Sequence, residues 1–285
     1  MFKPALLIAF MLAPQSPPAD SFPAHKIAGN LYYVGSRDLA SYLVVTPRGH
    51  ILINSGYEAT VPLIADAVES LGFKLADVKI LLDSHAHSDH VAGHAPLRAL
   101  LAKDAQVCVM KGDEGVVSSG GEGQYYYTKM RWKPCPVDRV LADGDAVTLG
   151  GTTLVARLTA GHTRGCTSWT MRVDDGGKPL DVVIVGSTNV NPGFSLLDNA
   201  DYPEIADDFA RTFRTLQSFP CDIFLGAHGS YYNLNAKYQL LKTRSQANPN
   251  PFLDPAGYRA FLANGEKAYL TNLGLQKAAR SFLPR

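Results

Sequence analysis

The chain has 285 residues, of which 46% are hydrophobic, and its 27 basic and 26 acidic residues give a formal net charge of +1. This length and apolar content suffice for one large domain with a substantial core. The balanced charge, with no basic run interleaved with aromatic residues, argues against a nucleic-acid-binding protein. We therefore expect a monomer whose partner is a small molecule, and no nucleic acid.

The amino terminus has the features of a secretory signal. Lys3 precedes the nine-residue apolar run Ala5–Ala13, which is too short to cross a bilayer but has the length of a signal-peptide hydrophobic region. We predict a signal peptide over residues 1–19, whose cleavage point the sequence does not define, export to the periplasm, and a single domain over residues 20–285. The alternative is a short packed helix at the amino terminus. No later segment is typical of a transmembrane helix, so no membrane association is expected after signal removal.

Strand and helix patterns alternate along the rest of the chain. Short apolar runs bounded by turn residues predict strands at 31–34, 41–46, 50–54, 78–82, 106–110 and 222–225, and through most of 140–185. Apolar residues at helical spacing predict helices at 64–71, 97–101 and 205–216, and helical structure after 225. Two halves, each made of strands followed by helices, predict sheets packed together with helices outside.

The strongest chemical signal follows the strand at 78–82. His85 and His87 lie two residues apart, which places both rings on one face of an extended segment, and Asp89 and His90 follow where the chain turns towards a helix. Three imidazoles and a carboxylate so close together carry a high electrostatic and desolvation cost unless a metal compensates it. Four such ligands exceed one catalytic zinc site and fall short of two.

Two further histidines also stand directly after strands and beside glycine. His162 lies in the sequence AGHTRG and His228 in LGAHG, positions typical of an active-site rim. Together with the cluster they complete six ligands, enough for two metals that each retain an open position. His25, His50 and His94 are isolated, and we interpret them as surface or core residues.

The motif HAHSDH at 85–90, followed in order by His162 and His228, resembles the metallo-β-lactamase superfamily. That resemblance implies an α+β fold, an αββα sandwich of two mixed β-sheets flanked by helices. Many members carry a metal-bridging aspartate, or a zinc-binding cysteine, where this chain has Ser187. A serine is too weak a ligand to bridge two zinc ions. With this departure, the sequence resembles the third subclass, B3, as do GHTRGCTSWT at 161–170 and NPFLDPAGYRAF at 250–261.

The resemblance also implies a reaction and a role for each ligand. Two Zn²⁺ ions would be bound per chain, and a metal-bound hydroxide would hydrolyse the amide of penicillins, cephalosporins and carbapenems, which gives antibiotic resistance. Asp89 could also orient the hydroxide, and Ser187 and Asn191 would bind the substrate carboxylate. The implied ligands are His85, His87 and His162 for the first zinc, and Asp89, His90 and His228 for the second.

Several interpretations stay open at this stage. Asp83 and Asn54 are candidates to orient ligand imidazoles, and Tyr125–Tyr127 with Trp132 could line a substrate groove or simply pack in the core. The alternative functions are a di-zinc hydrolase of the same fold acting on a lactone or thioester, and a non-catalytic zinc-binding protein. The sequence does not separate the possible pairings of its four cysteines, which are Cys108, Cys135, Cys166 and Cys221.

Overall fold

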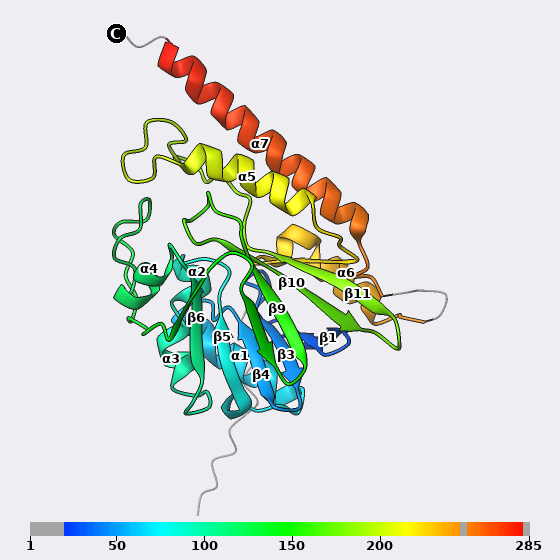
Figure 1. Ribbon diagram of the computed structural model, residues 1–285. Helices are drawn as coiled ribbons and strands as arrows, with labels where there is room; N and C mark the ends of the chain where they lie inside the picture. The colour runs from blue at the N-terminus through cyan, green and yellow to red at the C-terminus, as the bar shows by residue number, and fades with distance from the viewer. Residues whose placement is uncertain (1–19, 246–249, 282–285) are drawn as a thin grey trace, which may run out of the picture.

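A computed structural model describes residues 20–245 and 250–281 (Figure 1). The predicted signal peptide at 1–19 lies outside the described residues. The described chain forms two mixed sheets with helices around them, so the predicted α+β sandwich is confirmed.

The first sheet has seven strands in the order β1-β2-β3-β4-β5-β6-β7. Its strands β1 to β4 pair antiparallel, and β4 to β7 pair parallel. The bounds are β1 (His25–Ala28), β2 (Leu31–Tyr33), β3 (Tyr42–Thr46), β4 (Gly49–Ile53), β5 (Val78–Leu82), β6 (Gln106–Met110) and β7 (Arg139–Leu141).

The second sheet has five strands in the order β12-β11-β10-β9-β8, antiparallel except for the parallel pair β11 and β12. The bounds are β8 (Ala146–Leu149), β9 (Thr152–Leu158), β10 (Thr167–Asp174), β11 (Pro179–Val185) and β12 (Ile223–Gly226). The strand-rich region predicted at 140–185 is thus divided, because its first strand, β7, belongs to the other sheet. The short strand β1 was not predicted.

The α-helices are α1 (Val61–Ser70), α2 (Ser88–Val91), α3 (His94–Arg98), α4 (Glu114–Ser119), α5 (Ile205–Gln217), α6 (Leu234–Leu241) and α7 (Pro255–Ser281). Three 3₁₀ turns accompany them: η1 (Glu58–Thr60), η2 (Leu75–Asp77) and η3 (Gly229–Tyr232). Figure 1 shows α5 and α7 side by side, and the two helices pack against each other. The helix predicted at 97–101 is α3, which ends earlier and leaves Leu100 exposed.

Side chains that alternate between the two faces of each strand divide the core into two layers. In β4, Ile51 and Ile53 join Trp169 of β10 in the cluster between the sheets, whereas Leu52 joins Ile64 and Val68 of α1 in a cluster on the outer side of the first sheet. Successive side chains of a strand point to opposite faces, so one strand can contribute to both layers. The resulting rigid sandwich fixes the strand ends that carry the predicted ligands.

Candidate active site

The predicted ligands come from the loops after three strands of the two sheets. β5 of the first sheet leads into His85 and His87, and the short helix α2 then carries Asp89 and His90. In the second sheet, His162 follows β9 and His228 follows β12. The packing of one sheet on the other brings these loops together.

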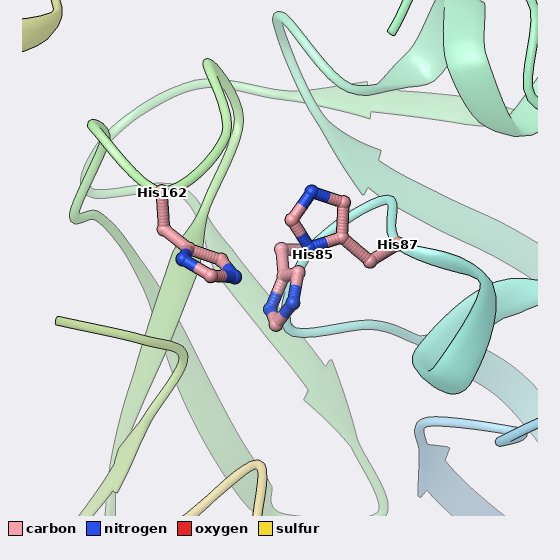
Figure 2. A group of neighbouring side chains, drawn as sticks. All are labelled: His85, His87 and His162. Atoms are coloured by element: carbon pink, nitrogen blue, oxygen red, sulfur yellow. The ribbon is translucent and has the colours of Figure 1, made fainter. Parts of the chain in front are cut away.

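His85, His87 and His162 form one compact group. A ring nitrogen of each lies within 4.8 Å of the others, and all three side chains are buried. The centroid of the His162 ring is 4.6 Å from that of His85 and 4.7 Å from that of His87. Figure 2 shows the three imidazoles converging from two separate loops. Three neutral nitrogens at such spacing match the donor set of a catalytic zinc site.

The other predicted ligands form a second group that adjoins the first. The Nε2 atoms of His90 and His228 face each other at 3.2 Å, and Asp89 Oδ2 lies 3.3 Å from the former and 3.6 Å from the latter. The ring centroids of His85 and His90 are 4.2 Å apart, which joins the two groups. The geometry therefore brings all six predicted ligands together.

Burial makes the imidazoles of the first group good metal ligands. It holds the pKa of His85 and of His87 well below the ordinary value, and neighbouring histidines add to the shift. Burial likewise lowers the pKa of His162 to about 4. Burial alone would raise the pKa of Asp89, but His90 and His228 hold it below its usual range. At neutral pH the first group thus offers unprotonated imidazoles, and Asp89 of the second group offers an ionised carboxylate, the forms that bind zinc.

Two contacts fix which nitrogen of a ligand ring faces the site. His162 Nδ1 lies 2.7 Å from the carbonyl oxygen of Asn189, to which it can donate its proton. His228 Nδ1 lies 2.9 Å from Asp38 Oδ2. In each ring the other nitrogen, Nε2, is then the one available to the site, as in the arrangement of known metal sites where a carboxylate or carbonyl orients a ligand histidine.

The predicted orienting roles of Asp83 and Asn54 are wrong. Asn54 accepts a hydrogen bond from the Ser84 backbone N–H and donates one to the Ala40 carbonyl, so it holds the end of β5 instead of an imidazole. The buried Asp83 carboxylate makes no hydrogen bond and lies 3.7 Å from His94 Nε2. The prediction failed because burial after a strand does not reveal which ring a carboxylate faces.

The structural interpretation of the isolated histidines is confirmed. His25 stacks on Tyr33, His50 packs edge-on against Phe73, and the Nδ1 atom of His94 contacts the Ser55 hydroxyl at 2.7 Å. Within the described ranges, none of the three belongs to a group of side chains with metal-binding spacing.

An open cavity of about 340 Å³ lies over the ligand groups. Asp89 and His228 are its more accessible ligands, with 24% and 21% of their side chains exposed, so solvent and a small molecule can reach the site. The cavity is lined by His85, His87, Asp89, His162 and His228 together with Tyr57, Ser88, Tyr127, Met130, Asn189, Asn191 and Tyr231. A larger hollow of about 800 Å³ crosses the second sheet but contains none of the ligands.

The two predicted substrate-binding residues differ in position. Asn191 lines the cavity, and its amide donates a hydrogen bond of 3.0 Å to the Tyr127 hydroxyl. Ser187 is completely buried, and its hydroxyl lies 3.3 Å from that of Tyr231, which does line the cavity. Ser187 thus reaches the cavity through Tyr231, a residue that the sequence analysis did not identify.

The aromatic residues of the loop after α4 divide between the two suggested roles. Tyr127 lines the cavity with its ring 5.0 Å from that of His87. Tyr125 donates a hydrogen bond to the His162 carbonyl and packs against Phe194, and Trp132 packs beside the outer core cluster. The four cysteines are all free thiols, so no disulfide joins the described residues.

Comparison with known proteins agrees with this geometry. Residues 37–228 match the family model described as the metallo-beta-lactamase superfamily. The FEZ-1 metallo-β-lactamase from Legionella gormanii is 48% identical, with 92% of this chain and 99% of that chain covered and a TM-score of 0.88. BJP-1, a subclass B3 metallo-β-lactamase of Bradyrhizobium japonicum, is 32% identical, with 91% and 97% covered and a TM-score of 0.83.

Two further matches differ in how much of the chain they cover. LRA-12, a class B3 di-zinc metallo-β-lactamase from an Alaskan soil metagenome, is 32% identical over 90% of this chain and 98% of its own, with a TM-score of 0.80. Human mitochondrial persulfide dioxygenase ETHE1 is 28% identical over 124 residues, which span only 39% of that protein.

The chain belongs to the metallo-β-lactamase superfamily, and its fold is that of this family. It is a hydrolase of the metallo-β-lactamase type whose structural relatives include subclass B3 enzymes. In the described part of the chain, the helices lack the combination of length and apolar character that crossing a membrane requires.

Proposed function

We propose that this enzyme hydrolyses the amide bond of β-lactam antibiotics with two zinc ions bound per chain, and so confers resistance to penicillins, cephalosporins and carbapenems. The observation that carries the proposal is the pair of adjoining ligand groups beneath an open cavity. Metallo-β-lactamases whose structures match this chain over nearly their whole length support the proposal.

Each ligand group would hold one ion. His85, His87 and His162 form the first site, and Asp89, His90 and His228 form the second. The chemistry that zinc supplies when bound is activation of a water nucleophile and polarisation of the scissile carbonyl. Asp89, which has a carboxylate at the cavity floor, would also orient the attacking water.

The polar lining of the cavity suits the substrate. A β-lactam antibiotic carries a carboxylate, and no lysine or arginine is among the described residues that line the cavity. Recognition of the carboxylate would therefore use neutral donors, which are available near Asn191, Asn189 and Tyr231, with Ser187 behind them. Because neutral donors bind a carboxylate less strongly than a guanidinium does, the metals would supply much of the affinity.

We also propose that residues 1–19 direct export and that the enzyme works in the periplasm as a monomer. β-Lactams reach that compartment before they reach their targets, so a periplasmic hydrolase meets the substrate first. Cell fractionation of a bacterium that expresses the full chain tests this proposal. Activity confined to the cytoplasmic fraction would contradict it.

The decisive experiment measures hydrolysis of a chromogenic cephalosporin and a carbapenem by the purified protein, before chelation, after chelation and after zinc is returned. We expect turnover that chelation abolishes and zinc restores. Faster turnover of a lactone or thioester than of any β-lactam would favour the alternative hydrolase. Tight binding of two zinc ions with no hydrolysis of any tested substrate would favour a non-catalytic zinc-binding protein.

Substitution of single ligands tests the assignment of the two sites. His162→Ala and Asp89→Ala should each reduce bound zinc from two ions to about one and lower kcat/KM by about 10²-fold or more, because each removes one of three ligands. Zinc content after gel filtration and steady-state kinetics check this expectation. Full activity in either variant would reject the ligand assignment.

A further inference from the structure

A buried carboxylate outside the ligand set connects the two loops that carry the first group of histidines. Asp113 follows β6 and stands at the N-cap position of α4, yet its side chain makes no capping hydrogen bond to its own helix. An aspartate at this position ordinarily caps the helix. The residue is only 2% exposed, and its carboxylate makes its hydrogen bonds elsewhere.

Three hydrogen bonds show where the carboxylate is used. Asp113 Oδ2 accepts from the Ala86 backbone N–H at 2.8 Å and from the Thr163 hydroxyl at 2.6 Å. Oδ1 accepts from the Gly165 backbone N–H at 2.8 Å. Ala86 stands between the ligands His85 and His87, and Thr163 directly follows His162, so one carboxylate binds both ligand loops.

The fit around Asp113 is close. A Cβ atom added to Gly165 would lie 2.7 Å from the Asp113 Cβ and from its backbone nitrogen, too near for any side chain to be accepted without movement. A separate backbone bond, from the Thr167 N–H to the Ser84 carbonyl at 2.7 Å, also joins the two loops. Loss of the Asp113 carboxylate would therefore loosen the spacing of the loops without separating the sheets.

The free-energy cost of burying the Asp113 carboxylate also favours a specific role for it. The Asp113 carboxylate forms no ion pair with a lysine, arginine or histidine in the described part of the chain. Each ion pair found there is made by an acidic residue other than Asp113. A buried carboxylate without a cationic partner costs folding free energy, which its hydrogen bonds offset only in part. Burial accordingly raises the pKa of Asp113 to about 6.

We propose that Asp113 is a positioning residue that sets the spacing of His85, His87 and His162, and thereby the affinity of the first site for metal. The inference rests on the proposed function, since it assumes that these three histidines bind zinc. It assigns no contact between Asp113 and the substrate or the metal. Its effect passes through the backbone of Ala86 and Gly165 and through the Thr163 hydroxyl.

The test measures zinc affinity at the first site alone. His228→Ala removes a ligand of the second site, and the pair H228A and H228A/D113A can then be titrated with zinc in competition with a chromophoric chelator. We expect the added Asp113→Ala change to weaken the remaining site by about 10- to 100-fold, the usual effect of removing a group that supports a metal ligand. In the otherwise unchanged chain, D113A should lower kcat more than it raises KM.

Asp138→Ala is the matched control for a merely structural carboxylate. Asp138 accepts a hydrogen bond of 2.8 Å from the Val107 backbone N–H and pairs with Arg98, and it belongs to neither ligand group. We expect D138A to lower the melting temperature without changing zinc affinity. If D113A lowers only the melting temperature and keeps the wild-type zinc affinity, the inference is wrong.

A milder change covers the case in which D113A does not fold. Thr163→Val keeps the shape of the side chain and removes one of the three hydrogen bonds, and a several-fold loss of zinc affinity is expected. Unchanged affinity in this variant would count against the inference. The failure of the proposed function is distinct, because it would appear in the parent protein as an absence of zinc binding or of hydrolysis.

Discussion

Asp38 orients the ring of His228, one of the proposed metal ligands. Its carboxylate lies 2.9 Å from His228 Nδ1 and also accepts a hydrogen bond from the Ser230 backbone N–H. These contacts, with the side-chain bond to His228 first, hold the pKa of Asp38 below its usual range. Asp38 therefore stays ionised at neutral pH and keeps the His228 ring turned with Nε2 towards Asp89 and His90.

Replacement of Asp38 should affect the second site selectively. We expect Asp38→Ala to weaken zinc binding there by about 10- to 100-fold, because the His228 ring loses its orienting partner. Asp38→Asn should have a smaller effect, since the amide oxygen can still accept the Nδ1 proton. Two-site zinc titrations check both variants, and an equal loss at the first site would contradict the argument.

The Tyr231 hydroxyl links the buried Ser187 to the surface of the cavity. It accepts a hydrogen bond of 3.0 Å from the Asn189 side-chain amide and lies 3.3 Å from the Ser187 hydroxyl. Tyr231→Phe should raise KM for β-lactams by roughly fivefold with little change in kcat, because one neutral hydrogen bond contributes about 1 kcal/mol. Steady-state kinetics with a carbapenem measure the effect. A fall in kcat at constant KM would place the hydroxyl in the chemical step instead.

At the scale of elements, the sequence predicted most strands and helices from their periodic patterns and offered candidate ligands at the strand ends. Alternating apolar residues identified most strands. His85 was singled out because it belongs to a cluster of imidazoles and a carboxylate, and His162 and His228 because each follows a strand beside a glycine. Asp38, Asp113 and Asn189 were missed because they lie in loops with no periodic pattern. Their partners are fixed only by tertiary packing, so composition and spacing carry no signal for them.

The edge strand β1 contributes a pH-sensitive residue, His25, that belongs to neither ligand group. His25 is buried between Tyr33 and Phe252, its Nδ1 contacts the Pro23 carbonyl at 2.8 Å, and its Nε2 has no partner. Burial lowers the pKa of His25 to about 4, well below the value of about 6.5 expected when unfolded. The unfolded chain therefore binds the proton more readily, and stability present above about pH 6.5 is lost as the pH falls towards 4.

His25→Phe should remove this part of the acid sensitivity while keeping the aromatic packing. Between about pH 7.5 and pH 5, the parent should lose about 2 kcal/mol more unfolding free energy than the variant. Urea unfolding of both metal-free proteins at the two pH values measures the difference. All other ionisable groups are common to both proteins, so their contributions cancel. Equal losses in the two proteins would show that His25 does not titrate in this range.

At the scale of the whole molecule, the proposed metals lie where the two sheets meet. The first site combines His85 and His87, which follow the first sheet, with His162, which follows the second. The second site combines Asp89 and His90 with His228 in the same way. Bound ions would thus join the two halves of the sandwich, and the unfolded chain has no such preformed site.

Removal of metal should therefore lower the stability of the entire domain. A ligand present at about 100 times its dissociation constant stabilises the native state by about 2.7 kcal/mol per site. For a chain of this size each kcal/mol corresponds to about 2–4 °C in melting temperature, so two filled sites should add at least about 10 °C. Calorimetry with chelator, and then with zinc restored, measures the shift.

Magnesium should not substitute for zinc in raising the melting temperature, because it prefers oxygen ligands and the ligand groups are mainly imidazole. H228A should keep roughly half of the zinc-dependent shift, since the first site remains, and a full shift in that variant would mean that His228 contributes nothing to holding the two sheets together.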